Sequence, residues 1–146
     1  MQAPLFIAAS ALCIVGVLSA PPSKPTTKEI VHATSKKCGA QTKATQEQLG
    51  LVYTDALPKD EVERCYLECV FAEVGVVKDN KFSEEGSLKL SELTFRDPKE
   101  KHLADQLIAT CSKEIAVKSE EKCSLGRAVR ECFAKHGKEV KFFPHA

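Results

Sequence analysis

Six cysteines between residues 38 and 132 constrain this chain more than any other feature. They are Cys38, Cys65, Cys69, Cys111, Cys123 and Cys132. An even number of cysteines in a small secreted chain is typical of a disulfide framework. The sequence therefore predicts a small domain that three disulfides hold together. Bridges of this kind stabilise a domain mainly by restricting its unfolded chain.

The chain begins with an apolar leader that predicts secretion. Residues 1–20 contain no charged side chain, and their apolar run is too short to span a bilayer and is followed by two prolines. We expect a signal peptide over 1–20 rather than a retained anchor, with cleavage after Ser19 as the alternative to Ala20. Its removal takes away the seventh cysteine, Cys13, and leaves one mature domain over 21–146.

Helical geometry narrows the possible disulfide pairings without deciding them. Cys65 and Cys69 lie four residues apart in a strongly helical stretch, with Cβ atoms roughly 5–6 Å apart. A disulfide needs Cβ atoms about 3.8 Å apart, so these two are expected to reach different partners. Cys123 and Cys132 lie on opposite sides of one predicted helix, about 13.5 Å apart along its axis. Excluding both pairs leaves ten of the 15 possible pairings.

Apolar residues recur at helical spacing through most of the mature chain, without a strand-like alternation or an internal repeat. The predicted fold class is therefore all-α, with five or six helices. The expected helices run from Thr26 or Thr27 to Cys38, from Thr45 to about Val52, over 58–74, from Ser83 to Leu93, from Asp97 to Ile115 and from Ser119 to His136. Residues 76–82 are predicted to form a loop.

Local signals indicate where several of these helices begin and end. Thr45–Gln48 has the form of a capping box. Asp97-Pro98 is the clearest helix start, with the aspartate as N-cap and the proline at the first helical position. Pro58 is expected in the first turn of the helix over 58–74. Gly39 and Gly75 are expected to end the helices that precede them.

The cysteine spacing resembles that of a known family. The order Cys38-x26-Cys65-x3-Cys69-x41-Cys111-x11-Cys123-x8-Cys132 is similar to the signature of the six-cysteine insect odorant-binding proteins, which include pheromone-binding and general odorant-binding proteins. The x3 and x8 intervals are the most diagnostic, and the resemblance covers essentially the whole mature chain. It implies the disulfides Cys38–Cys69, Cys65–Cys123 and Cys111–Cys132.

The same resemblance implies a compact domain of about six helices around an internal apolar cavity that binds small hydrophobic ligands. Periodicity alone cannot separate a core residue from a lining residue, so the cavity rests on the resemblance. The candidate ligand-binding residues are Leu49, Val52, Phe71, Val74, Leu88, Leu93, Leu103, Leu107, Ile108, Ile115, Val129, Phe133, Phe142 and Phe143. Hydroxyls that could orient a ligand are those of Tyr53, Tyr66 and Ser87.

The C-terminal tail, residues 138–146, follows the last cysteine and carries Phe142 and Phe143. Some odorant-binding proteins fold such a tail over or into the pocket, which the resemblance offers as one hypothesis here. The alternative is that the two rings pack on the domain surface. His136 and His145 flank the tail and could make ligand binding depend on pH. His32 and His102 could act in the same way.

Charge and motifs argue against several other functions. The net charge of +1 and the interspersed signs do not predict a nucleic-acid binder or an anionic-membrane binder. No nucleophile motif, His-Asp pair or calcium loop is present, so we expect neither an enzyme nor a cofactor. A zinc site built from Cys65, Cys69, His102 and His136 is the metal alternative, which the x3 spacing and the disulfide context oppose.

The sequence thus predicts a secreted carrier that solubilises odorants, pheromones or lipid-like molecules. Alternatives are a carrier or scavenger of the same fold in saliva, seminal fluid or haemolymph, and a saposin-like membrane-interacting protein. The expected partners are a small hydrophobic ligand and a chemosensory receptor, without nucleic acid or stable membrane insertion. The expected oligomeric state is a monomer or a homodimer.

Overall fold

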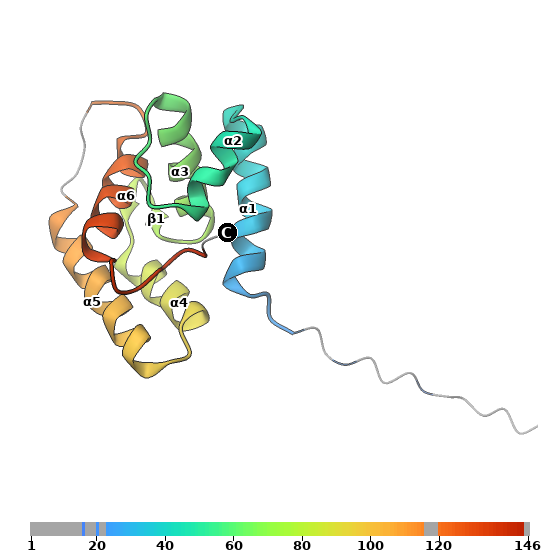
Figure 1. Cartoon of the computed structure of the whole chain (residues 1–146), viewed down its shortest axis with the longest axis vertical. Helices are drawn as coiled ribbons and strands as arrows, with labels where there is room; N and C mark the ends of the chain where they lie inside the picture. The colour runs from blue at the N-terminus through green and yellow to red at the C-terminus, as the bar shows by residue number, and fades with distance from the viewer. Residues whose placement is uncertain (1–15, 17–19, 21–22, 116–119, 145–146) are drawn as a thin grey trace, which may run out of the picture.

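The computed structural model describes residues 16, 20, 23–115 and 120–144. In these residues the chain forms six α-helices, one short 3-10 helix and a two-stranded hairpin (Figure 1). The elements are α1 Thr27–Thr42, α2 Gln46–Leu49, η1 Gly50–Tyr53, α3 Glu61–Glu73, β1 Val77–Lys78, β2 Lys81–Phe82, α4 Glu84–Thr94, α5 Pro98–Glu114 and α6 Ser124–His136. The predicted all-α fold of about six helices is confirmed. None of the helices described is long and apolar enough to cross a membrane.

Side-chain caps explain where several helices begin. Thr45 accepts from the amide of Gln48 while the Gln48 side chain accepts from the amide of Thr45, which is the predicted capping box. Asp97 accepts from two amides of the first turn of α5, with Pro98 at the first helical position as predicted. The predicted start at Ser83 is also confirmed, because its hydroxyl accepts from the Gly86 amide.

Two predicted helix starts are wrong. α3 begins at Glu61 rather than at Pro58, because the carboxylate of Asp60 accepts from the Glu63 amide and caps the helix there. α6 begins at Ser124, after Cys123 in the left-handed conformation with φ 58°. The predicted start at residue 119 lies outside the described residues. A cysteine tied into a disulfide thus takes the cap position in place of a polar residue.

The expectations for Gly39 and residues 76–82 are also corrected. α1 continues past Gly39 to Thr42, and a Cβ atom at Gly39 would lie 2.2 Å from Cδ2 of Leu49. Gly39 is therefore a close contact between α1 and α2 and does not end the helix. Residues 76–82 contain the hairpin of β1 and β2, turned by Asp79 and Asn80 at positive φ. Gly75, at φ +88°, does follow the end of α3 as predicted.

Three disulfides join four helices in series. Cys38–Cys69 joins α1 to α3, Cys65–Cys123 joins α3 to the start of α6, and Cys111–Cys132 joins α5 to α6. Their Cα–Cα distances are 5.7, 4.9 and 5.8 Å. These are the pairs that the family resemblance implies. They place α3 between α1 and α6, and Figure 1 shows the same order.

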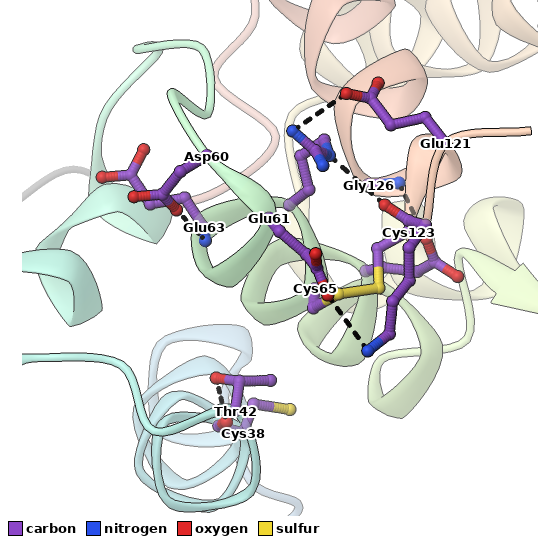
Figure 2. The surroundings of a disulfide bond; sticks show 12 residues. Cys38, Thr42, Asp60, Glu61, Glu63, Cys65, Glu121, Cys123 and Gly126 are labelled. Atoms are coloured by element: carbon purple, nitrogen blue, oxygen red, sulfur yellow. Dashed lines mark hydrogen bonds and ion pairs between the residues drawn. A yellow bond between two sulfur atoms is a disulfide. The ribbon is translucent and has the colours of Figure 1, made fainter. Parts of the chain in front are cut away.

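Polar contacts surround the bridge between α3 and α6 (Figure 2). Arg64 pairs with Glu121 at 3.1 Å, and Lys122 pairs with Glu61 at 3.0 Å. The Glu68 carboxylate accepts from the Gly126 amide at 3.2 Å. These contacts hold the residues before α6 against the N-terminal half of α3. The backbones of the two helices can therefore approach closely.

The close approach of α3 and α6 depends on Gly126. A Cβ atom at this position would lie 2.2 Å from the Arg64 carbonyl oxygen and 2.8 Å from the Glu68 nitrogen. Both are backbone atoms, so a side chain could be accommodated only if one helix moved. Gly50 offers a matched contrast, because a Cβ atom there meets nothing within 4 Å and its φ is −63°.

We predict that Gly126→Ala lowers the free energy of unfolding by about 1–3 kcal/mol, because the added methyl group separates two covalently bridged helices. Gly50→Ala should leave it nearly unchanged. Urea unfolding of the oxidised proteins measures both. Equal stability of Gly126→Ala and the unmodified chain would contradict the close contact.

Candidate functional site

The segment after α6 buries its apolar side chains in the helical domain, while Lys138, Glu139 and Lys141 are exposed. It leaves α6 at Gly137, turns back and crosses the helices in the view of Figure 1. Its apolar side chains are buried, with exposed fractions of 5 % for Val140, 3 % for Phe142 and 8 % for Phe143. The hypothesis that the two rings pack into the domain, rather than onto its surface, therefore describes this structure.

All six phenylalanines that follow the leader belong to one connected cluster of rings. Phe142 lies 5.2 Å from Phe133 of α6 and 5.7 Å from Phe95. Phe143 lies 5.5 Å from Phe71 of α3. The rings are tilted or edge-to-face, an arrangement worth about 0.5–1.5 kcal/mol per pair beyond area burial. The tail therefore packs as part of the core.

Little space remains beside the tail. The cavity that touches the two tail rings has a volume of about 20 Å³, room for about one water molecule. It is lined by Thr54, Asp55, Phe71, Leu107, Arg130, Phe133, Ala134, Gly137, Val140, Lys141, Phe142 and Phe143. Around the two tail rings, the interior is therefore filled by the chain's own side chains.

The candidate ligand-binding residues fall into four groups. Those that line the small cavity are Phe71, Leu107, Phe133, Phe142 and Phe143. Those buried in the core without lining it are Val52, Ile108 and Val129. Those partly buried against the core are Leu49, Val74, Leu88, Leu103 and Ile115. The fourth group is Leu93 alone, which is 50 % exposed, and its predicted inward orientation is wrong.

The candidate hydroxyls are placed differently from one another. Tyr66 is fully buried and donates to the carbonyl of Leu49 at 2.8 Å, and burial raises its pKa to about 12. Tyr53 lies with its hydroxyl 3.5 Å from Nδ1 of His32, toward the outside. Ser87 is buried, and its hydroxyl has no hydrogen-bond partner among the described residues. Tyr66 is thus committed to the backbone of α2.

The disulfide pattern excludes the zinc site that was the metal alternative. Cys65 and Cys69 each form a disulfide, so neither offers a thiolate to a metal. Among the described residues one other cluster brings metal-ligating types together: Glu114, Cys132 and His136. Cys132 is bridged to Cys111, which leaves one carboxylate and one imidazole.

Comparison with known proteins identifies the family of this domain. The PBP/GOBP family matches residues 20–136, most of the chain. The chain belongs to the PBP/GOBP family. The resemblance to insect odorant-binding proteins drawn from the cysteine spacing is thereby confirmed.

Relatives and solved structures agree with this assignment. The chain is 25 % identical over 130 residues to general odorant-binding protein 19d of Drosophila melanogaster, covering 88 % of this chain and 85 % of the relative. Odorant-binding protein dmelOBP28a of the same species has a TM-score of 0.63 at 20 % identity, over 75 % of this chain and 90 % of its own. Odorant binding protein 5 of Apis mellifera has a TM-score of 0.61 at 20 % identity, over 77 % and 89 %. The two structures show that the fold is shared.

Sequence reasoning missed Arg130 of this PBP/GOBP protein. Its side chain is 4 % exposed and donates from its two terminal nitrogens to the carbonyls of Thr54 and Leu51, which fixes η1 and the residue after it to α6. Burial lowers the pKa of Arg130 to about 10, although the charge of Asp55 opposes this effect. Its place on the buried face of α6, beside Val129 and Phe133, was the available signal.

We predict that Arg130→Met destabilises the domain by about 1–2 kcal/mol, because two carbonyl groups lose a charged donor. Arg127→Met is the control on the same helix. Arg127 is exposed and, within the part of the chain that the structure describes, its ion pair is with Glu131 one turn away, so its loss should leave stability nearly unchanged. Thermal unfolding of both variants measures the difference. An Arg130→Met variant as stable as Arg127→Met would contradict the anchoring role.

A second polar contact joins the ends of α5 and α6. Nε2 of His136 lies 2.8 Å from a carboxylate oxygen of Glu114, next to the Cys111–Cys132 bridge. The hydrogen bond with His136 holds the pKa of Glu114 below its ordinary value of 4.5. A carboxyl group whose pKa is lowered by folding stabilises the folded state at pH values above its ordinary pKa. This stability is lost as the pH falls through the lowered pKa.

We predict that the Glu114 carboxyl titrates below pH 4.5 in the intact protein and moves up toward that value in His136→Ala, because the donor is removed. Carbon-detected NMR titration of the glutamate side chains measures this. The control is His102→Ala, at an exposed histidine near the other end of α5. If Glu114 titrates at the same pH in both variants, His136 does not set its pKa.

Proposed function

We propose that this protein is a secreted carrier of small hydrophobic molecules, and that a ligand binds in the interior by replacing the rings of Phe142 and Phe143. Membership of the PBP/GOBP family supports the carrier role. The observation that carries the mode of binding is the burial of these two rings among Phe71, Phe95 and Phe133. The family match begins at residue 20, beside the expected cleavage site after Ser19 or Ala20, and residues 1–19 lie outside it, as expected of a signal peptide.

The way in which the tail is held favours exchange with a ligand. The last disulfide ends at Cys132, before the tail begins. In the described part of the chain, no hydrogen bond or ion pair joins residues 138–144 to the helices. The segment is held by apolar packing, and burial of an apolar ligand supplies the same kind of free energy at about 25 cal/mol per Å². A ligand can therefore take the place of residues 138–144 without breaking a hydrogen bond or ion pair between these residues and the described helices.

The ligand class follows from the walls that remain after the tail leaves. Rings of α3, α6 and the segment before α5 give an apolar surface, and Arg130 is already committed to backbone carbonyls. Thr54, Asp55 and Lys141 also line this space, but its walls are mainly rings, so we expect broad selectivity for uncharged apolar molecules. One added methylene should change the affinity by about 0.8 kcal/mol.

The test is uptake of the apolar fluorescent probe N-phenyl-1-naphthylamine by the oxidised mature protein. We expect the double variant Phe142→Ala/Phe143→Ala to bind the probe about tenfold more tightly, because the open state no longer competes with the packed tail. Dodecanol should displace the probe in both proteins. The control is Lys138→Ala, at an exposed side chain of the same segment that does not line the cavity, which should leave the affinity unchanged.

Two outcomes would contradict the proposal. No probe uptake by either folded, fully oxidised protein would mean that the helices pack without a site, and the carrier function would fail. Uptake that is weaker in the double variant would mean that the rings form part of the site instead of occupying it.

A further inference from the structure

A second, larger concavity lies on the outside of the domain between α1 and the pair α2–η1. Its volume is about 680 Å³, within the range of roughly 300–1,000 Å³ typical of small-molecule sites. It is lined by His32, Ser35, Lys36, Gly39, Ala40, Lys43, Ala44, Gln46, Leu49, Gly50 and Tyr53. None of these residues lines the interior cavity beside the tail. We call this concavity the α1–α2 groove.

Small side chains and one leucine give the α1–α2 groove an apolar floor. Gly39 and Ala40 of α1 leave room for the Leu49 side chain, which occupies the position that a Cβ atom at Gly39 would need. The carbonyl of Leu49 is held from inside the domain by the Tyr66 hydroxyl at 2.8 Å. The wall of the groove is therefore anchored to the core, and the groove is preformed rather than an opening between loose segments.

The rim of the groove carries charge of one sign. Lys36 and Lys43 line it together with the imidazole of His32, and no lining residue is acidic. Both lysines are exposed, and in the described part of the chain neither forms an ion pair. Lys37 of the same helix contrasts with them, because it pairs with Glu73 of α3 at 2.8 Å and does not line the groove.

We propose that the α1–α2 groove binds a free amphipathic carboxylate of the fatty-acid class. The alkyl chain lies on the floor formed by Gly39, Ala40 and Leu49, and the carboxylate is held at the rim by Lys36 and Lys43. An apolar floor beside two lysines, with no acidic residue in the lining, complements this ligand at both ends. A hollow between two helices fits one extended chain, whereas adsorption to a membrane would need an exposed flat face. This site is separate from the proposed interior site.

The experiment compares dodecanoate, below its critical micelle concentration, with dodecanol, which has the same chain without the charge. Titration calorimetry is performed on the oxidised mature protein and on the double variant Lys36→Gln/Lys43→Gln. Lys37→Gln is the matched control on the same helix. NMR shift perturbation of the backbone amides of Ala40, Ala44 and Gly50 locates the ligand independently of the affinities.

We expect the double variant to bind dodecanoate about fivefold more weakly, because two exposed charge pairs are lost. Lys37→Gln should bind it as the unmodified protein does, and dodecanol affinity should be the same in all three. Dodecanoate should shift the groove amides, and these shifts should persist in Phe142→Ala/Phe143→Ala. This last result separates the groove from the interior site, whose affinity that variant changes.

Three results would overturn the proposal. The first is a dodecanoate affinity that the loss of Lys36 and Lys43 leaves unchanged. The second is a set of shifts confined to residues around Phe71 and Phe133, which would place the carboxylate in the interior and leave the carrier function intact. The third is sedimentation with phosphatidylglycerol vesicles without binding of free dodecanoate, which would make the groove a membrane contact.

Discussion

Helix α3 is bridged on two sides, and the rest of the domain is built around that constraint. Cys69 holds it to α1, and Cys65, one turn earlier, holds it to the start of α6. Two cysteines four residues apart on one helix cannot reach each other without distortion, so each draws in a different neighbour. The third bridge adds α5 to α6. Helices α1, α3, α5 and α6 therefore stay next to one another, whether side chains or a ligand fill the space between them.

The proposed exchange of the tail for a ligand depends on this covalent series. The core of a domain of about 126 residues leaves only a modest excess of stability, and emptying part of it would normally unfold the chain. Each bridge restricts the unfolded ensemble and contributes about 2–4 kcal/mol. The bridged segment ends at Cys132, so Phe142 and Phe143 of the tail lie outside it. In the proposed exchange, Cys132 therefore divides the bridged helices from the segment that leaves.

The sequence was sufficient for features that depend on local chemistry. The capping box at Thr45 and the start of α5 at Asp97 follow from one side chain and the amides within reach of it. The cysteine spacing was sufficient for the family. The sequence was not sufficient to locate the start of α3. Asp60 and Pro58 both favour the start of a helix, and only the fold decides between them.

The interior was less predictable, because the apolar periodicity of a helix indicates which of its faces is buried but not which residues or ligand pack against that face. α4 buries the small polar residues Ser87 and Ser91 and exposes Leu93, since the Ser91 hydroxyl donates to Asp105 of α5. A pattern based on apolar residues selects the wrong stripe in such a helix. Arg130 was missed for a related reason: its partners are backbone carbonyls, which leave no mark in the sequence.

The placement of charge separates the two proposed sites by ligand class. Arg130, the buried cation beside the interior, already donates to two carbonyls, so a carboxylate that paired with it would have to displace those hydrogen bonds. An uncharged apolar molecule meets no such penalty among the rings. The rim of the α1–α2 groove is the opposite case, because Lys36 and Lys43 remain in water and have no acidic partner in the described part of the chain. A carboxylate bound there keeps much of its hydration while its alkyl chain is buried on the floor. Charged and uncharged ligands of equal chain length are therefore expected to partition between the outside and the inside of the same domain.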